Sequence, residues 1–73
     1  MMATERNWYT LGGSLVGRLA ADGIWFFKDT GRTIGYRDGD IIYRTTGTVI
    51  GRLDSQDKNI FSETGEPLGY LEP

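Results

Sequence analysis

The amino-acid sequence contains four copies of one short pattern, and this repeat constrains the fold more than any other feature. Each copy has an aromatic residue, a turn glycine four positions later, and a second glycine another four positions on, with an aliphatic residue directly before it. The turn glycines are separated by 18, 16 and 18 residues and are Gly13, Gly31, Gly47 and Gly65. The second glycines are Gly17, Gly35, Gly51 and Gly69. Within 73 residues, such a repeat predicts four copies of one supersecondary unit around a shared core.

Alternate copies resemble each other more closely than neighbouring copies do. The first and third copies have tyrosine before the turn and Gly-Arg-Leu after it, whereas the second and fourth have phenylalanine before the turn and Gly-Tyr after it. Equivalent glycines of alternate copies, such as Gly13 and Gly47, are 34 residues apart. The sequence therefore predicts a duplicated pair of units, with pseudo-fourfold symmetry and a stronger pseudo-twofold symmetry.

Each copy has the pattern of a β-hairpin. The residues before the turn are aromatic or β-branched, as half-buried strands prefer, and they are Trp8-Tyr9, Phe26-Phe27, Ile42-Tyr43 and Ile60-Phe61. Threonine precedes the turn glycine in three copies. Because threonine disfavours positive φ, this order favours a type I turn followed by a left-handed glycine bulge over a type I′ turn.

The predicted loop fixes the pairing of the two strands. The residue five positions before the turn glycine then faces the residue three positions after it. These predicted pairs are Trp8/Val16, Phe26/Ile34, Ile42/Ile50 and Ile60/Leu68. On the other face, the repeat aromatics lie beside the residues two positions after the turn glycine, which gives the pairs Tyr9/Leu15, Phe27/Thr33, Tyr43/Val49 and Phe61/Pro67. We expect the second glycines to mark tight bends or close strand approaches.

The links between copies are short, which favours an up-and-down arrangement of antiparallel strands. We therefore predict an all-β fold of four hairpin repeats in a pseudo-fourfold (2+2) meander or small barrel-like arrangement. Residues 1–73 form a single domain, with hairpin units at about residues 7–21, 24–37, 41–53 and 59–71. Both faces of each hairpin carry apolar side chains, so either the hairpins close around a filled centre or one face meets another subunit.

The composition narrows the functional classes. Without cysteine or histidine, the chain has no thiolate zinc site, no disulfide and no imidazole base. Asp38 and Asp40 flank a turn, but two carboxylates are too few for calcium. We expect no catalytic residues, metal or cofactor, and no enzyme activity. A net charge of −2 argues against general nucleic-acid binding. The longest apolar run, residues 24–27, falls far short of the roughly 20 residues that cross a bilayer, so no membrane contact is expected.

One repeat position combines charge with aromatic rings. It follows the second glycine and holds Arg18, Tyr36, Arg52 and Tyr70. We predict that these four side chains share the face of Trp8 and form a ring around the axis. The ring either packs on itself through cation–π contacts or binds an anion or a partner. Trp25 lies outside the repeated apolar positions, so it is either a core residue or an exposed anchor for a partner.

The repeated phrase resembles that of the fourfold beta-flower proteins, a group of small bacterial hairpin-repeat proteins. The matching stretches are Ile42-Tyr43-Arg44…Gly47…Ile50-Gly51 and Ile60-Phe61-Ser62…Gly65…Leu68-Gly69. The family often has aspartate after the aromatic, where this chain has Thr10, Lys28, Arg44 and Ser62. The resemblance implies the fold and a bacterial origin, but no site residues. We expect the protein to be cytoplasmic. A weaker likeness, to PRC-barrel domains, rests on Val16-Gly17-Arg18-Leu19 and covers one copy only.

The leading functional hypothesis is a non-catalytic binding or protein-interaction module that self-associates and has a possible protein partner. Alternatives are a small-ligand or anion binder that uses the Arg/Tyr ring, and an enzyme whose site lies on an oligomer axis. Residues 1–53 carry seven basic and five acidic side chains (net +2), whereas residues 54–73 carry one basic and five acidic side chains (net −4). A head-to-tail contact between subunits or a solvated acidic edge would both explain this asymmetry.

Overall fold

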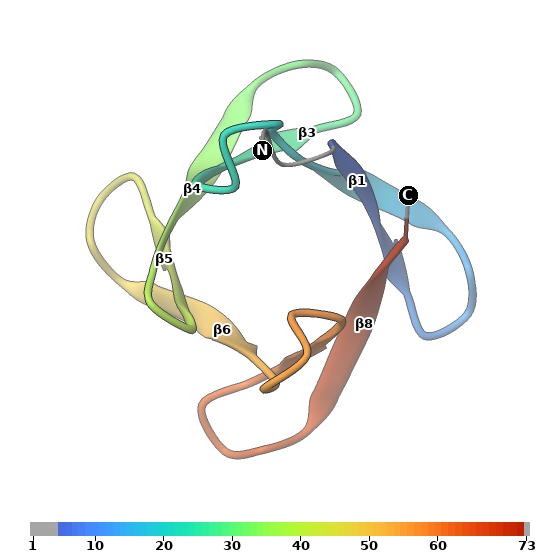
Figure 1. The fold of residues 1–73 in the computed structure, drawn as a ribbon, viewed down its shortest axis with the longest axis vertical. Coiled ribbons are helices and arrows are strands. Elements are labelled where there is room, and N and C mark those ends of the chain that lie inside the picture. Colours follow the sequence, from blue (N-terminus) through green and yellow to red (C-terminus); the bar gives the residue numbers. More distant parts are fainter. Residues whose placement is uncertain (1–4, 73) are drawn as a thin grey trace.

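The computed structural model describes residues 5–72, in which eight antiparallel strands follow one another around a closed barrel (Figure 1). The strands are β1 (Arg6–Thr10), β2 (Leu15–Leu19), β3 (Trp25–Lys28), β4 (Thr33–Asp38), β5 (Ile41–Arg44), β6 (Val49–Leu53), β7 (Asn59–Phe61) and β8 (Pro67–Glu72). Each strand pairs with its neighbours in sequence, and β8 pairs with β1 to close the barrel. The predicted all-β hairpin barrel is confirmed. Within these residues, no helix is long and apolar enough to span a bilayer.

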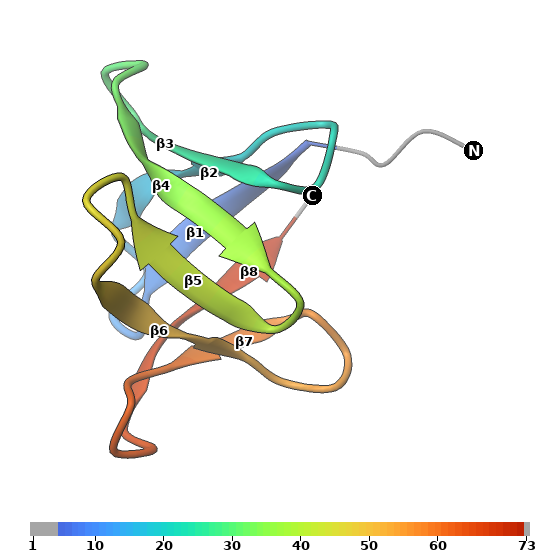
Figure 2. The same ribbon diagram turned by 90° about the vertical axis from the view of Figure 1, so that its left-hand side faces the viewer.

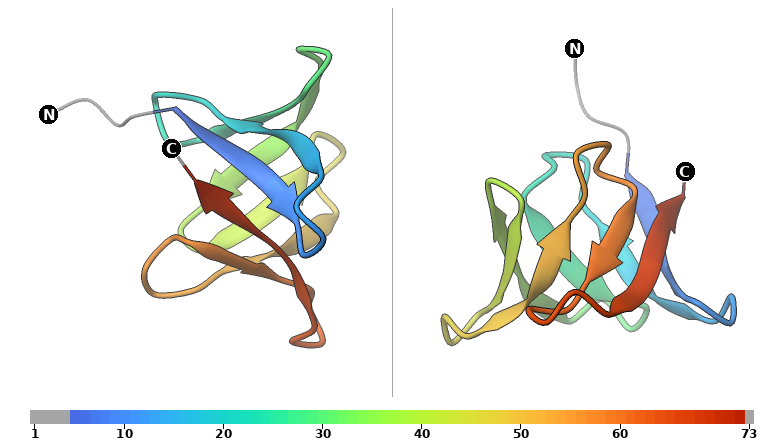
Figure 3. Two further views of the ribbon diagram at one scale, coloured as in Figure 1. Left: turned by 90° about the vertical axis from the view of Figure 1, so that its right-hand side faces the viewer. Right: turned by 90° about the horizontal axis from the view of Figure 1, so that it is seen from below.

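The barrel has two different ends (Figures 2 and 3). The four loops that contain the turn glycines splay outward at one end, which we call the loop end. They are the first loop (residues 11–14), the second (29–32), the third (45–48) and the fourth (62–66). The three links between hairpins lie at the opposite end, which we call the link end.

The four loops have the predicted turn. In the first loop, the Gly13 amide donates to the Thr10 carbonyl oxygen at 2.9 Å, and the Thr10 amide donates to the Ser14 carbonyl oxygen at 2.8 Å. The other loops repeat both hydrogen bonds. The turn glycines have φ values of 87–96°, the left-handed region that other residues avoid. A type I turn closed by a glycine bulge is therefore confirmed.

The bulge shifts the pairing on one side of every hairpin. The predicted pair Tyr9/Leu15 and its three equivalents are confirmed. The predicted pair Trp8/Val16 is wrong, because Trp8 lies opposite Gly17 and Val16 is the extra residue of the bulge. The same correction applies to the other copies, where Phe26, Ile42 and Ile60 lie opposite Gly35, Gly51 and Gly69.

Inward-facing side chains fill the barrel. The buried core consists of Trp8, Leu19, Phe26, Ile42, Leu53, Ile60 and Leu71. Half-buried Val16, Ile34 and Ile50 pack against it. At the middle of the barrel, each hairpin contributes one large side chain opposite a glycine, for example Phe26 opposite Gly35. Because the glycine has no side chain, one large residue per hairpin fills this level.

The second glycines also let adjacent hairpins approach closely. A Cβ atom added to Gly17 would lie 1.9 Å from the carbonyl oxygen of Phe27, the repeat aromatic of the next copy. For Gly35, the distance to the Tyr43 carbonyl oxygen would be 1.8 Å. Gly51 and Gly69 make equivalent approaches. The predicted close strand approach is confirmed, and it occurs between hairpins.

One inward position carries a charge. Leu19, Leu53 and Leu71 are buried there, but the second copy has Arg37, which lies opposite the core residue Ile42. The Arg37 Nη2 donates to the Asp57 Oδ2 at 3.1 Å, at the link end. The side chains are 19% and 43% exposed, so water screens this pair.

We expect the substitution Arg37→Leu to raise the free energy of unfolding by about 1 kcal/mol. The leucine completes the apolar layer, and replacing a partly buried ion pair with apolar contacts is often neutral or stabilising. Urea unfolding at pH 7 measures the change. Asp57→Asn is the control, because it leaves the Arg37 charge without its partner and is expected to destabilise. Equal destabilisation by both substitutions would contradict this expectation.

Candidate functional site

The outer wall of the barrel carries four cross-strand rows of side chains, and these rows contain all five predicted site residues. Each row has four residues. The first two belong to one copy and are an outward residue of its first strand and the residue after its second glycine. The last two belong to the next copy and are its repeat aromatic and the residue opposite that aromatic. We name each row after its first residue. The rows are Asn7, Arg18, Phe27 and Thr33; Trp25, Tyr36, Tyr43 and Val49; Ile41, Arg52, Phe61 and Pro67; and Asn59, Tyr70, Tyr9 and Leu15.

The predicted Arg/Tyr ring lies on the wall, so its predicted placement on the face of Trp8 is wrong. The bulge is the reason, because its extra residue turns each residue after the second glycine to the outer face. The affected residues are Arg18, Tyr36, Arg52 and Tyr70. They share one repeat position, as predicted, and three of them pack on the aromatic of the next copy. The Arg18 Cζ lies 5.1 Å from the centroid of the Phe27 ring.

The two arginines of this set do not form one anion site. They lie on β2 and β6, which are on opposite sides of an eight-stranded barrel. The Arg18 Nε lies 3.4 Å from the Glu5 Oε1, so this guanidinium has an ion-pair partner. Arg52 is exposed and forms no ion pair among residues 5–72. An anion bound within one chain would therefore meet only one of these two arginines.

The Trp25 row has three aromatic rings in succession. Trp25 is 42% exposed, so of the two alternatives for this residue the structure shows the exposed one. Its ring packs edge-to-face on Tyr36, with centroids 5.7 Å apart, and Tyr36 stacks on Tyr43 at 5.4 Å. The related row, 34 residues away in sequence, has a Tyr70–Tyr9 stack at 5.5 Å but asparagine at position 59. Only one of these two rows is therefore extended by tryptophan.

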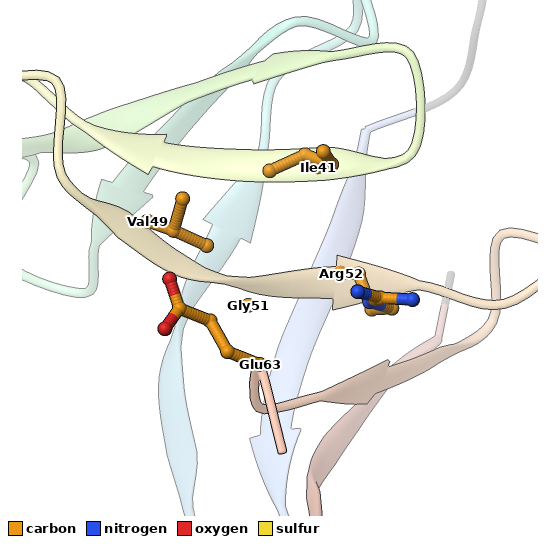
Figure 4. A pocket seen from close by; sticks show the side chains of 5 residues that line it. All are labelled: Ile41, Val49, Gly51, Arg52 and Glu63. Carbon is orange, nitrogen blue, oxygen red and sulfur yellow. The ribbon is translucent and has the colours of Figure 1, made fainter. Parts of the chain in front are cut away.

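A pocket of about 200 Å³ lies at the end of the Trp25 row (Figure 4). Its lining consists of Ile41, Val49, Gly51, Arg52 and Glu63. Ile41 and Val49 form apolar walls on β5 and β6, and Glu63 extends from the fourth loop toward β6. Sequence reasoning missed this pocket, because its residues come from three elements and share no repeat position.

The shortest ladder of the barrel borders the pocket. Strands β6 and β7 pair at two positions only, Arg52 with Phe61 and Leu53 with Ile60. In the related ladder between β2 and β3, Gly17 also pairs with Lys28. The equivalent pair at Gly51 is not formed, so the pairing of β6 with β7 ends one residue earlier toward the loop end, next to the pocket.

The polar groups of the link end have structural roles. The Lys58 amide donates to the Asp54 Oδ1 at 2.9 Å, and the Asn59 Nδ2 donates to the Asp54 Oδ2 at 2.8 Å. These hydrogen bonds lower the pKa of the Asp54 carboxyl group from its ordinary value and order the link between β6 and β7. Over the described residues 5–72, no three acidic side chains gather as a metal site would require.

Comparisons of the chain with protein-family models, with curated proteins and with solved structures find no match. The resemblance to fourfold beta-flower proteins therefore depends on the residues of the repeat alone and stays a prediction. The structure itself defines a small closed β-barrel of hairpin repeats, with a row of three aromatic rings on its outer wall, exposed Trp25 and half-buried Tyr36 and Tyr43, that ends at a pocket.

Proposed function

We propose that this barrel is a non-catalytic protein-interaction module that binds its partner across the Trp25 row. The observation that carries the proposal is the unbroken series of rings from Trp25 through Tyr36 to Tyr43, next to a pocket. Tryptophan and tyrosine dominate the binding energy of protein interfaces, because they bury large rigid surfaces at a low entropic cost. We place the protein in the bacterial cytoplasm, in line with the resemblance of its repeat.

The size of the pocket favours a peptide segment over a free small molecule. Pockets for small ligands usually measure about 300–1,000 Å³, whereas this pocket measures about 200 Å³. A volume of this size accommodates one aliphatic side chain. Arg52 and Glu63 at its edge supply a hydrogen-bond donor and an acceptor for the peptide backbone. A segment that lies along the Trp25 row would therefore insert one apolar side chain between Ile41 and Val49.

The test replaces Trp25 with the residue of the related row. Peptides that bind the wild-type protein are first selected from a random displayed library. We expect them to bind Trp25→Asn about 30-fold more weakly, which corresponds to about 2 kcal/mol for a lost hot spot. The change lies on the wall, so the fold is expected to persist. Fluorescence anisotropy of a labelled peptide measures Kd.

Two tyrosines at one repeat position provide a matched control. Tyr36→Leu and Tyr70→Leu each remove one ring of a stacked pair on the wall. The proposal expects weaker peptide binding for Tyr36→Leu and unchanged binding for Tyr70→Leu. Equal Kd values for both variants, or selected peptides that bind Trp25→Asn as tightly as the wild type, would contradict it.

A further inference from the structure

The loop end of the barrel has an exposed apolar surface that the Trp25 row does not include. Leu11 in the first loop is 62% exposed and Leu68 on β8 is 37% exposed. A Cβ atom added to Gly51 would lie 3.2 Å from the Leu68 Cδ1, so the Leu68 side chain lies across the barrel opening toward β6. The half-buried residues Val16 and Ile34 pack against the core directly after the first and second loops. Apolar groups thus extend across this end.

The four loops around this surface differ in charge. Lys28 precedes the second loop, which contains Arg32 and one acidic residue, Asp29. The fourth loop contains Glu63 and Glu66 and no basic residue. The first loop has no charged residue. The third loop has none either, and Arg44 precedes it.

The order of the loops places opposite charges across the barrel axis. Figure 1 shows the second loop opposite the fourth, and the first opposite the third. Two barrels that meet loop end to loop end, about a twofold axis along the line from the first loop to the third, place each second loop on the partner's fourth loop. Both basic loops then meet acidic loops, and the apolar first loops meet each other. The perpendicular choice of axis would place like charges together at both contacts.

We propose that the loop end is a self-association surface that holds two copies of this chain about that twofold axis. A twofold interface must be complementary to itself, and this charge pattern satisfies the condition for one axis only. In this arrangement the third loop contacts the third loop of the partner copy. Arg44 lies beside that loop and donates to the Val49 carbonyl oxygen of its own chain at 3.2 Å, which keeps its guanidinium away from the contact.

The outline of the end face sets an upper limit on the area that a dimer can bury there. The two longer dimensions of the barrel are 31 and 27 Å, so this limit is roughly 800 Å², the area that each partner contributes to a standard interface. This surface shares one residue with the peptide site, because Glu63 also lines the pocket. Trp25 lies outside the loop end, so Trp25→Asn alters peptide binding without altering the self-association surface.

Charge reversal tests the pairing of the loops. Light scattering behind a sizing column is expected to give the wild type twice the 8.2 kDa mass of the chain at all but the lowest concentrations. K28E/R32E makes both loops acidic and E63K/E66K makes both basic, so each variant alone is expected to be a monomer. An equimolar mixture of the two variants is expected to regain the doubled mass, because each acidic loop then meets a basic one.

The mixture also checks that both variants fold, since an unfolded chain would not restore the dimer. Lys58→Glu, a reversal at the link end, is the matched control and is expected to keep the doubled mass. A monomeric wild type, a dimeric K28E/R32E or a mixture that stays monomeric would overturn the proposal. Mass that keeps growing with concentration would indicate head-to-tail contacts and would also overturn it. Trp25→Asn is expected to remain dimeric.

Discussion

Gly35→Ala is expected to remove a large part of the stability of the barrel at 25 °C. The added Cβ would lie 1.8 Å from the carbonyl oxygen of Tyr43 and 3.0 Å from the Cα of Arg44. Both are backbone atoms that the pairing of β4 with β5 holds in place, so no rotamer change relieves the contact. The contact is relieved only if the two strands move apart. We expect a loss of about 4 kcal/mol or more, against a total stability of about 4–11 kcal/mol for a chain of this length.

Gly12→Ala is the matched control for this substitution. A Cβ on Gly12 would meet nothing closer than the Thr10 Oγ1 at 3.9 Å, and Gly12 is not in the left-handed region. Alanine there restricts the unfolded chain, which stabilises a protein by about 0.4–1 kcal/mol. Urea unfolding, followed by tryptophan fluorescence at one fixed protein concentration, compares the two variants. A Gly35→Ala variant that unfolds cooperatively near the wild-type midpoint would show that the hairpins can move apart at little cost.

Phe26→Ala is expected to have the second largest effect, a loss of about 3–5 kcal/mol. Phe26 is fully buried and packs edge-to-face on Trp8, with ring centroids 5.8 Å apart. Its truncation leaves a cavity in the middle of the barrel. Surrounding strands cannot collapse into this cavity, because the closed ladder fixes the barrel diameter. The free energy of unfolding from urea titration measures the loss.

The neighbouring residue provides a sharp comparison. Trp25→Ala removes a larger ring one position away, but from the outer wall, and it is expected to cost about 1 kcal/mol, because it removes the edge-to-face contact with Tyr36. Phe26→Ile, which introduces the residue of the third and fourth copies at this position, is expected to cost less than Phe26→Ala because it fills part of the cavity. Similar losses for Trp25→Ala and Phe26→Ala would mean that the wall residue is as important for stability as the core residue.

The repeat predicts the hairpins, their turns and half of their register. Threonine before the turn glycine is enough to favour the bulged loop, because its side chain restricts φ. The repeat does not indicate which residue after the turn is left unpaired. Pairing Trp8 with Val16 joins two apolar side chains and looks favourable, whereas the structure pairs Trp8 with Gly17 to make room in a narrow barrel. This one-residue difference also reversed the predicted face of Arg18 and its equivalents.

The candidate site was predictable only in part. Trp25 stands out in the sequence because it lies outside the repeated apolar positions. For the same reason, the periodicity of the repeat cannot predict whether its side chain is buried or exposed. The separation of Arg18 from Arg52 follows from the order of strands around a closed barrel, which no single hairpin indicates. The pocket is lined by residues of β5, β6 and the fourth loop, and the repeat, which describes one hairpin at a time, does not indicate that these three elements converge.

The ladder between β8 and β1 differs from the other ladders in its effect on the rate of folding. Every other ladder joins strands that are adjacent in sequence, whereas this one joins Asn7 to Glu72. Most of the loop-closure entropy is therefore lost when this one ladder forms, and contacts of such long range slow folding. The hairpins can form in any order, but the barrel can close only when its first strand meets its last. We therefore expect the pairing of β1 with β8, the one long-range ladder of the barrel, to limit the rate of folding.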